Sequence, residues 1–470
     1  MLLAQVPHTG PQSRSFRTVP TDGLVCLVSR YSLTLVSVNT LQEQIIIPHL
    51  SPIYLYSIAD YKGFVNMKKK LAIIGRGTAG CLAAANFLKW VDYEIDWYFD
   101  GNIKPQAVGE GAQLTFPRLL EVCLGFYYSD LPKIDGTIKL GIRKMGWGND
   151  SDFYHNFQGG GNVSYHFNAH KLQEYIFNEV KDNPRVTLKE GNVGNHDSID
   201  ADFIMDCSGF PKNYDDFHIA KYISVNAVHV TQCYWDHPRF NHTITMARPH
   251  GWAFGIPLQN RCSIGYMYNH EMSSLEEVKE DAKEVFKKLD LVPSDVTNSF
   301  KFKNFYRKEN FSADARVAYN GNASFFLEPM EATTITVMRE INRTAFEVWS
   351  GMISSKVANK IYTERLELIE REIMIHYYAG SPFKTKFWDY VKHRAELAMR
   401  SNMELPQFLA MLERAERELK ENGMKHTYVI GEHFQDLPFA TWGIYSWKLH
   451  IHELGVLDRL LGLRNEVLSQ

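Results

Sequence analysis

The clearest hydrophobic pattern in the chain is a short apolar run at residues 71–74 that ends in three glycines and leads into an alanine-rich stretch. The glycines have the spacing Gly-x-Gly-x-x-Gly. This order is typical of a strand, a tight turn and a helix: the first glycine makes the turn, the second admits a pyrophosphate, and the third lets helix and strand pack. The sequence therefore predicts a dinucleotide site. Its expected cofactor-binding residues are Gly75, Gly77, Thr78, Ala79 and Gly80.

Two later apolar runs extend this unit. Residues 93–99 read as a second strand, which ends at Asp100, 25 positions after Gly75. An acidic residue at that point suits a ribose hydroxyl, although Asp100-Gly101 is also a common turn pair. Residues 202–206 precede a glycine turn that ends at Gly209, and such a strand is expected to return to the same parallel sheet.

Alternation with a period of two predicts further strands. Residues 135–142 read as one strand, on which Lys139 lies on the face opposite to Ile138 and Leu140. By itself, a lysine in such a place is most often a solvated residue at a sheet edge. Residues 221–305 are predicted to form a β-rich insertion.

Helical periodicity appears in two regions. A helix is predicted to open at His166 and to run to about residue 181, and helices dominate from about residue 335 onward, with caps at Gly380 and Gly423. His166 and His170 have the i,i+4 spacing of metal ligands, but no acidic or cysteine partner follows at ligand spacing. The pair is therefore interpreted as one buried and one helix-surface histidine, and no metal is expected.

Composition narrows the class of protein. A chain of 470 residues with 45% apolar and 22% charged residues is expected to form a large core and two closely packed domains. The net charge of -3 gives no reason to expect nucleic acid or an anionic membrane as a partner, and no apolar run reaches membrane-spanning length. The six cysteines lack a Cys-x-x-Cys pair and are expected to be reduced thiols in a cytoplasmic protein.

Residues 1–66 fit poorly with this pattern, because nucleotide-binding folds of this type usually begin close to their first strand. Met67, which three lysines follow, reads like a natural start. We hypothesise that residues 1–66 are an over-extended reading frame or a dispensable extension. The alternative is a small ordered appendage, since residues 25–36 alternate like a strand.

Five further segments carry recognisable motifs. Residues 108–110 read Val-Gly-Glu, 136–139 Gly-Thr-Ile-Lys, 206–209 Asp-Cys-Ser-Gly, 252–257 Trp-Ala-Phe-Gly-Ile-Pro and 326–331 Phe-Leu-Glu-Pro-Met-Glu. With the glycine motif, these segments resemble the flavin-dependent halogenases of the tryptophan halogenase family over most of residues 67–400. Phe254 replaces the second tryptophan of that family's Trp-x-Trp-x-Ile-Pro segment.

The resemblance implies a chemistry in which two residues act on the halogen and the substrate. Reduced FAD, O2 and halide give hypohalous acid, which passes through the protein to Lys139. Glu331 orients this electrophile and takes the proton that the aromatic substrate releases. The backbone N–H groups of Thr333 and Thr334, at the start of a helix, are expected to hold the halide. This role outweighs the interpretation of Lys139 as a solvated residue.

The resemblance also implies the remaining site residues and the partners. The further cofactor-binding residues are Asp100, Val108, Gly109, Glu110, Gly209, Thr334 and Ile335. The expected substrate pocket consists of Phe157, His166, Trp252, Phe254, Trp442 and Tyr445. Only one dinucleotide fingerprint is visible, so reduced FAD is expected to arrive as a diffusible cosubstrate from a separate flavin reductase. The substrate is expected to be a small, electron-rich aromatic molecule, and a homo-oligomer is compatible with the sequence.

The expected fold is thus α/β: the Rossmann-type FAD-binding fold of flavoprotein monooxygenases and halogenases, with a β-rich insertion and a helical C-terminal substrate region. The expected boundaries are 1–66 for the extension, 67–340 for the FAD-binding halogenase module and 341–470 for the helical substrate-binding region. An alternative function is an FAD-dependent aromatic monooxygenase, which needs neither Lys139 nor Glu331. A third, a non-catalytic flavin-binding or partner-binding protein, predicts no halide-dependent product.

Overall fold

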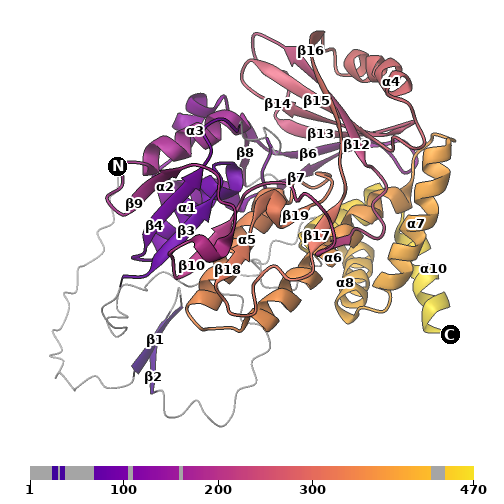
Figure 1. Cartoon of the computed structure of the whole chain (residues 1–470). Helices are drawn as coiled ribbons and strands as arrows, with labels where there is room; N and C mark the ends of the chain where they lie inside the picture. Colours follow the sequence, from indigo (N-terminus) through magenta and orange to yellow (C-terminus); the bar gives the residue numbers. More distant parts are fainter. Residues whose placement is uncertain are drawn as a thin grey trace, which may run out of the picture. The chain divides into compact units, whose positions relative to one another are not determined.

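The computed structural model divides the chain into two compact units, Met1–Gly63 and Phe64–Gln470 (Figure 1). In the first unit it describes only the backbone of two antiparallel strands, β1 (Leu24–Ser29) and β2 (Ser32–Ser37). The hypothesis about residues 1–66 falls mostly outside the described residues and stays a hypothesis. In the second unit, to which everything below refers, the structure describes residues 68–103, 110–157, 162–424 and 440–469.

A five-stranded parallel sheet is built around the predicted strand–turn–helix unit. Its middle strand, β3 (Lys70–Ile74), is buried along almost its whole length, and helix α1 (Thr78–Trp90) follows the glycine turn. An uninterrupted apolar run suits a strand that is covered on both faces. The predicted second strand and the predicted return of residues 202–206 to this sheet are confirmed. The strand order is β18 (Val317–Tyr319), β10 (Phe203–Asp206), β3, β4 (Glu94–Phe99) and β9 (Val186–Glu190).

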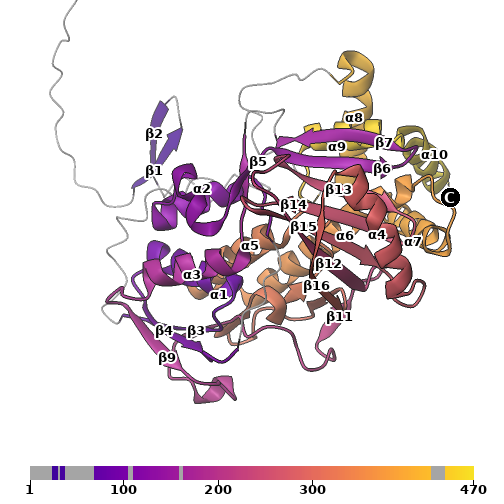
Figure 2. The same ribbon diagram turned by 90° about the horizontal axis from the view of Figure 1, so that it is seen from above.

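Helices from distant parts of the chain cover this sheet. Helix α1 packs against α3 (Ala169–Val180) and α5 (Thr334–Trp349), and Figure 2 shows α1 and α3 lying side by side over β3 and β4. The helix predicted to open at His166 begins three residues later, at Ala169, because His166 ends strand β8 (Ser164–His166). One histidine is buried and one lies on the helix surface, as expected: His166 is fully buried, whereas His170 is exposed on α3. Helix α3 begins after Asn168, whose side chain accepts a hydrogen bond from the Lys171 N–H group.

The β-rich region forms a second, seven-stranded sheet. It is not made from the insertion alone, because β6 (Gly141–Trp147) and β7 (Ser151–Asn156) join it through the parallel pairing of β6 with β13. Helix α4 (Leu275–Lys288) packs against β12 and β15. The strand order is β16 (Pro293–Lys301), β12 (Ala227–Tyr234), β15 (Arg261–Tyr268), β14 (Gly251–Pro257), β13 (His242–Arg248), β6 and β7.

The single strand expected over residues 135–142 is two strands, which corrects the prediction. β5 (Thr137–Lys139) pairs with β8, and β6 begins at Gly141 in the seven-stranded sheet. Leu140 joins them by donating its N–H to the Asn241 carbonyl and accepting from the Phe157 N–H, at 2.9 and 3.0 Å. A Cβ at Gly141 would overlap the His155 carbonyl oxygen. The chain therefore changes sheets at this point.

The C-terminal part of the chain is helical, as predicted. Gly380 and Gly423 cap two of its helices, with φ angles of 82° and 57°. None of the described helices has both the length and the apolar character needed to cross a membrane. The predicted boundary at residue 340 falls within α5. The helices after α5 are α6 (Ser355–Ala379), α7 (Lys386–Asn402), α8 (Pro406–Asn422), α9 (Ile444–Glu453) and α10 (Leu457–Leu468).

Candidate active site

The glycine turn has the geometry of a phosphate cradle. Gly75 has a φ of +99°, and a Cβ there would overlap the Cys207 carbonyl oxygen; a Cβ at Gly80 would overlap the Gly75 carbonyl oxygen. By contrast, nothing lies within 4 Å of the Cβ position at Gly77. Gly77 is the N-cap of α1, with no side-chain cap and no acidic residue in the first turn. The first N–H groups of α1 are therefore free to bind an anion such as a pyrophosphate.

This difference among the glycines predicts two different phenotypes. Gly80→Ala is expected to destabilise the fold by about 3 kcal/mol or more, because the new methyl group overlaps backbone.

In Gly77→Ala the new methyl group meets no atom, and the residue has an ordinary φ of -72°, so the free energy of unfolding is expected to stay within about 1 kcal/mol of wild type. The substitution is expected to weaken FAD binding at least tenfold, because the methyl group would occupy the open space that the predicted pyrophosphate site needs. Thermal unfolding and FAD titration by fluorescence check both; normal FAD affinity in Gly77→Ala would contradict the cradle.

The other predicted cofactor residues have mixed surroundings. Asp100 accepts hydrogen bonds from the Asn102 backbone and side chain, at 2.8 and 3.1 Å, as a turn residue does; its ribose role stays a prediction. Glu110 is buried and forms an ion pair with Arg261 at 2.6 Å. Gly209 has a φ of +106° and open space at its Cβ position. Val108 and Gly109 lie outside the described residues.

Lys139 is completely buried at the end of β5. Its Nζ atom has no hydrogen-bond partner among the described residues and lies 5.5 Å from the centre of the Phe157 ring. Burial lowers the pKa of Lys139 to about 7, although the Glu331 carboxylate opposes this effect. Its neighbour Ile138 is exposed instead. The interpretation of Lys139 as a solvated edge residue is therefore wrong.

Glu331 lies in the loop before α5 and is held from several sides. Its Oε1 atom forms an ion pair with Lys144 of β6 and lies 3.3 Å from His376 Nε2, while Oε2 accepts a hydrogen bond from Trp442 Nε1 at 3.2 Å. Its main-chain carbonyl accepts from Gln113 Nε2 at 3.0 Å. Burial acts to raise the pKa of Glu331, but Lys144 and His376 hold it well below its usual range. The carboxylate is therefore ionised.

The predicted halide residues follow directly after Glu331. Ala332 has a φ of 53°, in the left-handed region, and turns the chain into α5. Thr333 is the N-cap of this helix and makes no side-chain cap hydrogen bond, and Thr334 and Ile335 are its first residues. Thr333 and Ile335 are buried. The N–H groups of a helix start thus lie next to Glu331 in the sequence, and their halide role stays a prediction.

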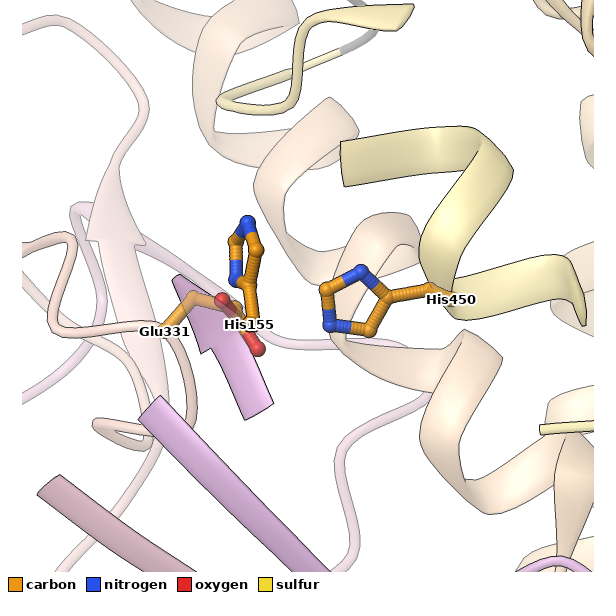
Figure 3. A group of neighbouring side chains, drawn as sticks. All are labelled: His155, Glu331 and His450. Atoms are coloured by element: carbon orange, nitrogen blue, oxygen red, sulfur yellow. The ribbon is translucent and has the colours of Figure 1, made fainter. Parts of the chain in front are cut away.

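Two buried histidines complete this side of the site (Figure 3). They are His155 of β7 and His450 of α9. One ring nitrogen of each histidine and one carboxylate oxygen of Glu331 all lie within 4.8 Å of one another. His155 Nε2 lies 2.8 Å from Ser446 Oγ, and His450 Nδ1 donates to the Ser446 carbonyl at 2.7 Å. Burial lowers the pKa of both rings, that of His155 to about 4, so both are neutral at pH 7.

Within the described ranges, His155, Glu331 and His450 are the one group close enough to hold a metal ion. No metal is expected from the sequence, and none of the three belongs to a metal-binding spacing motif. Lys144 already neutralises the Glu331 carboxylate, which reduces the attraction of the group for a cation. We therefore interpret these side chains as part of a reaction pocket.

The predicted pocket residues are brought together only in part. Phe157, Trp442 and Tyr445 surround His155, with ring centres 6.2, 6.5 and 6.4 Å from it, and His166 lies with Lys139 around Gly111. Trp252 and Phe254 form a separate pair on β14, with ring centres 6.0 Å apart. Trp442 stacks on His450 at 3.8 Å and 16°.

Sequence reasoning missed Lys144, His155, His376 and His450 as site residues. Lys144 follows Arg143, and two adjacent cations on a strand read as solvent-facing. On one uninterrupted strand, Lys139 and Lys144 would also point to opposite faces, because they are five positions apart, an odd number. The break at Leu140 resets this alternation, so both are buried. Gly141 is the one sequence feature that could have indicated this break.

Comparison with known proteins identifies the class of enzyme. The family model for tryptophan halogenase matches residues 70–185 and 159–425. The chain therefore belongs to the tryptophan halogenase family, which makes it an FADH2-dependent halogenase, an oxidoreductase. The predicted family and fold are both confirmed.

Solved structures show the same fold at low sequence identity. A flavin-dependent halogenase from Xanthomonas campestris, Xcc4156, superposes with a TM-score of 0.65 at 19% identity, covering 86% of this chain and 96% of that one. A tryptophan halogenase from Shewanella frigidimarina gives a TM-score of 0.64 at 16% identity, with coverages of 86% and 94%. BrvH, a flavin-dependent halogenase from Brevundimonas, gives 0.62 at 18%, with coverages of 85% and 96%.

Proposed function

We propose that this enzyme halogenates a small, electron-rich aromatic molecule through Lys139, with reduced FAD, O2 and halide as co-reactants. The observation that carries the proposal is a completely buried lysine without a hydrogen-bond partner among the described residues, in the electrostatic reach of a buried carboxylate. A buried polar group without a partner is costly to keep and is typical of functional sites. When bound, reduced FAD from a separate flavin reductase would activate O2, and O2 would supply the oxidising equivalent that converts halide to hypohalous acid.

The residues at the glycine turn fit the dinucleotide. The open space at Gly77 and the uncapped start of α1 suit the pyrophosphate, and Asp100 at the end of β4 is the residue for the ribose. We assign the halide to the N–H groups of Thr333 and Thr334, where the positive end of the α5 dipole favours an anion.

Lys139 is suited to receive the oxidised halogen. Its neutral amine attacks the halogen of hypohalous acid, which forms the N–X bond and breaks the O–X bond, and water leaves after taking the amine proton. The arene then attacks the same halogen, the N–X electron pair returns to nitrogen, and this nitrogen takes up one proton to restore the amine, which balances the proton that the arene loses. If Lys139 stays protonated, it instead donates a hydrogen bond that polarises the hypohalous acid. A pKa of about 7 makes both forms available near neutral pH.

Glu331 is the acceptor for the proton that the arene loses. The cationic intermediate of aromatic substitution is a strong acid, so a carboxylate with a low pKa still accepts its proton. The contacts from Lys144, His376 and Trp442 fix the carboxylate in one orientation. The rings of Phe157, Trp442 and His155 offer flat surfaces for an aromatic substrate on this side.

The rate of halogen transfer is expected to depend on pH through Lys139. Its neutral form increases as the pH rises through about 7, so halogenation at saturating hypohalite should rise about tenfold per pH unit below that point and level off above it. Rapid mixing of the protein with hypobromite and arene measures this step without the flavin. A profile that falls as the pH rises through 7 would show that the ammonium form, and not the amine, is active.

The test of the proposal is a screen of phenols, indoles and pyrroles against chloride, bromide and iodide, with FAD, NADH and a flavin reductase. Mass spectrometry should detect a halogenated arene whose formation requires halide. The alternative reading, an aromatic monooxygenase, predicts an oxygenated product that forms equally well without halide. A non-catalytic flavin-binding protein predicts neither product.

A further inference from the structure

Two buried lysines approach the Glu331 side of the site, and their environments differ. Lys144 Nζ forms an ion pair with Glu331 Oε1 and lies 2.8 Å from His376 Nε2. Lys139 Nζ, equally buried, has no such partner in the part of the chain that the structure describes. The negative charge of Glu331 is thus balanced by Lys144, which has no role in the proposed reaction.

We propose that Lys144 is a positioning residue: it serves as the ammonium partner of Glu331 and thereby leaves Lys139 as the uncharged amine. The role of Lys139 as halogen acceptor rests on the proposed function, but the distribution of charge between the two lysines does not. Lys144 acts through Glu331 and not on the reacting atoms.

The contacts of Glu331 explain why Lys144 is its partner. Oε1 faces Lys144 and His376, and Oε2 faces the indole N–H of Trp442. The main-chain carbonyl of Glu331 is tied to Gln113, whose Oε1 atom accepts from Thr336 on α5 at 2.8 Å. The ammonium of Lys144 on β6 and the indole N–H of Trp442, which precedes α9, therefore hold the two carboxylate oxygens.

The charged groups around the two lysines favour one ammonium over two. The histidines are neutral, since burial lowers the pKa of each of them, and burial raises the pKa of Glu372 to about 8, so that it holds a proton at pH 7. Among the described groups that face the two lysines, Glu331 is then the one charged carboxylate, and a second ammonium would leave a net positive charge in a buried site. The groups that face Lys139 are Glu331, Lys144, His155, His166 and His242. Those that face Lys144 are Glu331, Glu372, His155, His376 and His450.

Burial lowers the pKa of Lys144 as well, but its contact with Glu331 opposes that effect directly. Lys139 lacks this contact and receives only the longer-range attraction of Glu331, which the charge of Lys144 partly cancels. Removing the charge of Lys144 leaves Glu331 with an unmatched negative charge. Lys139, whose ammonium form Glu331 already favours, can then carry the compensating proton.

The test measures the protonation of Lys139 directly in the full-length protein. Lysine labelled with 13C at Cε gives one resonance per residue, and the resonance absent from Lys139→Met identifies Lys139. We expect its titration midpoint near pH 7 in wild type and at least about one pH unit higher in Lys144→Met, because an unmatched carboxylate favours the ammonium. In Lys144→Met/Glu331→Gln, which has neither charge, the midpoint should return to the wild-type value or lie below it.

Lys144→Arg is the matched control, because it keeps the charge at the same place. In Lys144→Arg, the titration midpoint of Lys139 should stay low, and the halogenation rate should rise with pH over the same range as in wild type. In Lys144→Met, both the midpoint and this rise in rate should move to higher pH. If Lys144→Met does not fold, Lys144→Gln takes its place: it also lacks the charge but keeps a hydrogen-bond donor for Glu331, and it should raise the midpoint of Lys139 relative to Lys144→Arg.

Two results would overturn the inference. In one, Lys139 keeps its midpoint in Lys144→Met while the rate falls equally at every pH, which is the behaviour of a residue that only supports the fold. In the other, Lys144→Arg raises the midpoint as much as Lys144→Met does, which shows an effect of shape and not of charge. Because the NMR titration needs no substrate, a failure of the proposed halogenation leaves this comparison interpretable.

Discussion

Lys139→Met should abolish halogenation, by about a thousandfold or more, while the protein becomes more stable. The loss follows from removing the amine to which we assign the oxidised halogen. The gain follows from burial: Lys139 is fully buried, its Nζ has no partner among the described residues, and an apolar side chain of similar length removes the cost of desolvating an amine. We expect the free energy of unfolding to rise by about 1–3 kcal/mol. Product analysis and thermal unfolding of the same preparation measure both effects.

Two controls make this prediction specific. Peroxide production from reduced FAD should continue in Lys139→Met, because the glycine turn to which we assign the dinucleotide is untouched. Ile138→Ala changes the adjacent residue on the exposed face of β5 and should keep halogenation within about twofold of wild type. If Lys139→Met retains turnover, the amine has no part in the chemistry and the monooxygenase alternative gains.

Glu331→Gln should also abolish halogenation, but with the opposite effect on stability. The rate is expected to fall by about 10²–10⁴-fold, which is the usual contribution of a positioned base. Lys144 loses its ion-pair partner in a buried site, so the free energy of unfolding should fall by about 3 kcal/mol. Product analysis and denaturant unfolding of Glu331→Gln measure these effects.

Adding Lys144→Met to Glu331→Gln should restore most of the stability and none of the activity, because the double variant has no unpaired buried charge. Glu331→Asp, which keeps the charge on a shorter side chain, separates the two functions of the carboxylate: stability should stay closer to wild type, while the rate stays low. Normal activity in Glu331→Gln would remove Glu331 from the mechanism.

The sequence was sufficient for the fold because its strongest signals are local. The buried run before Gly75, the three glycines and the helix that follows specify one supersecondary unit, and the structure places it at the centre of the parallel sheet. The caps at Gly380 and Gly423 were visible for the same reason, since a residue that ends a helix acts on its own turn.

The site was less predictable because its contacts are distant in the sequence. Lys144 and Glu331 are 187 positions apart, and Glu331 and Trp442 are 111 apart. No periodicity encodes such contacts. Local patterns misjudged Lys139 as well: alternation placed it correctly on the face opposite to Ile138, but which face is buried depends on how β5 and β6 separate at Leu140. Only the family resemblance gave Lys139 a role in the reaction.

The most direct test of the central claim is the product that wild type and Lys139→Met form from one arene in bromide, with FAD, NADH and a flavin reductase. A phenol, indole or pyrrole found in the screen serves as substrate, and the product is analysed by mass spectrometry. The account predicts a product with the isotope pattern of bromine in wild type, none without bromide, and none in Lys139→Met, although reduced FAD is consumed in both proteins. An oxygenated product that forms without bromide, or a brominated product that forms equally well in Lys139→Met, would contradict it.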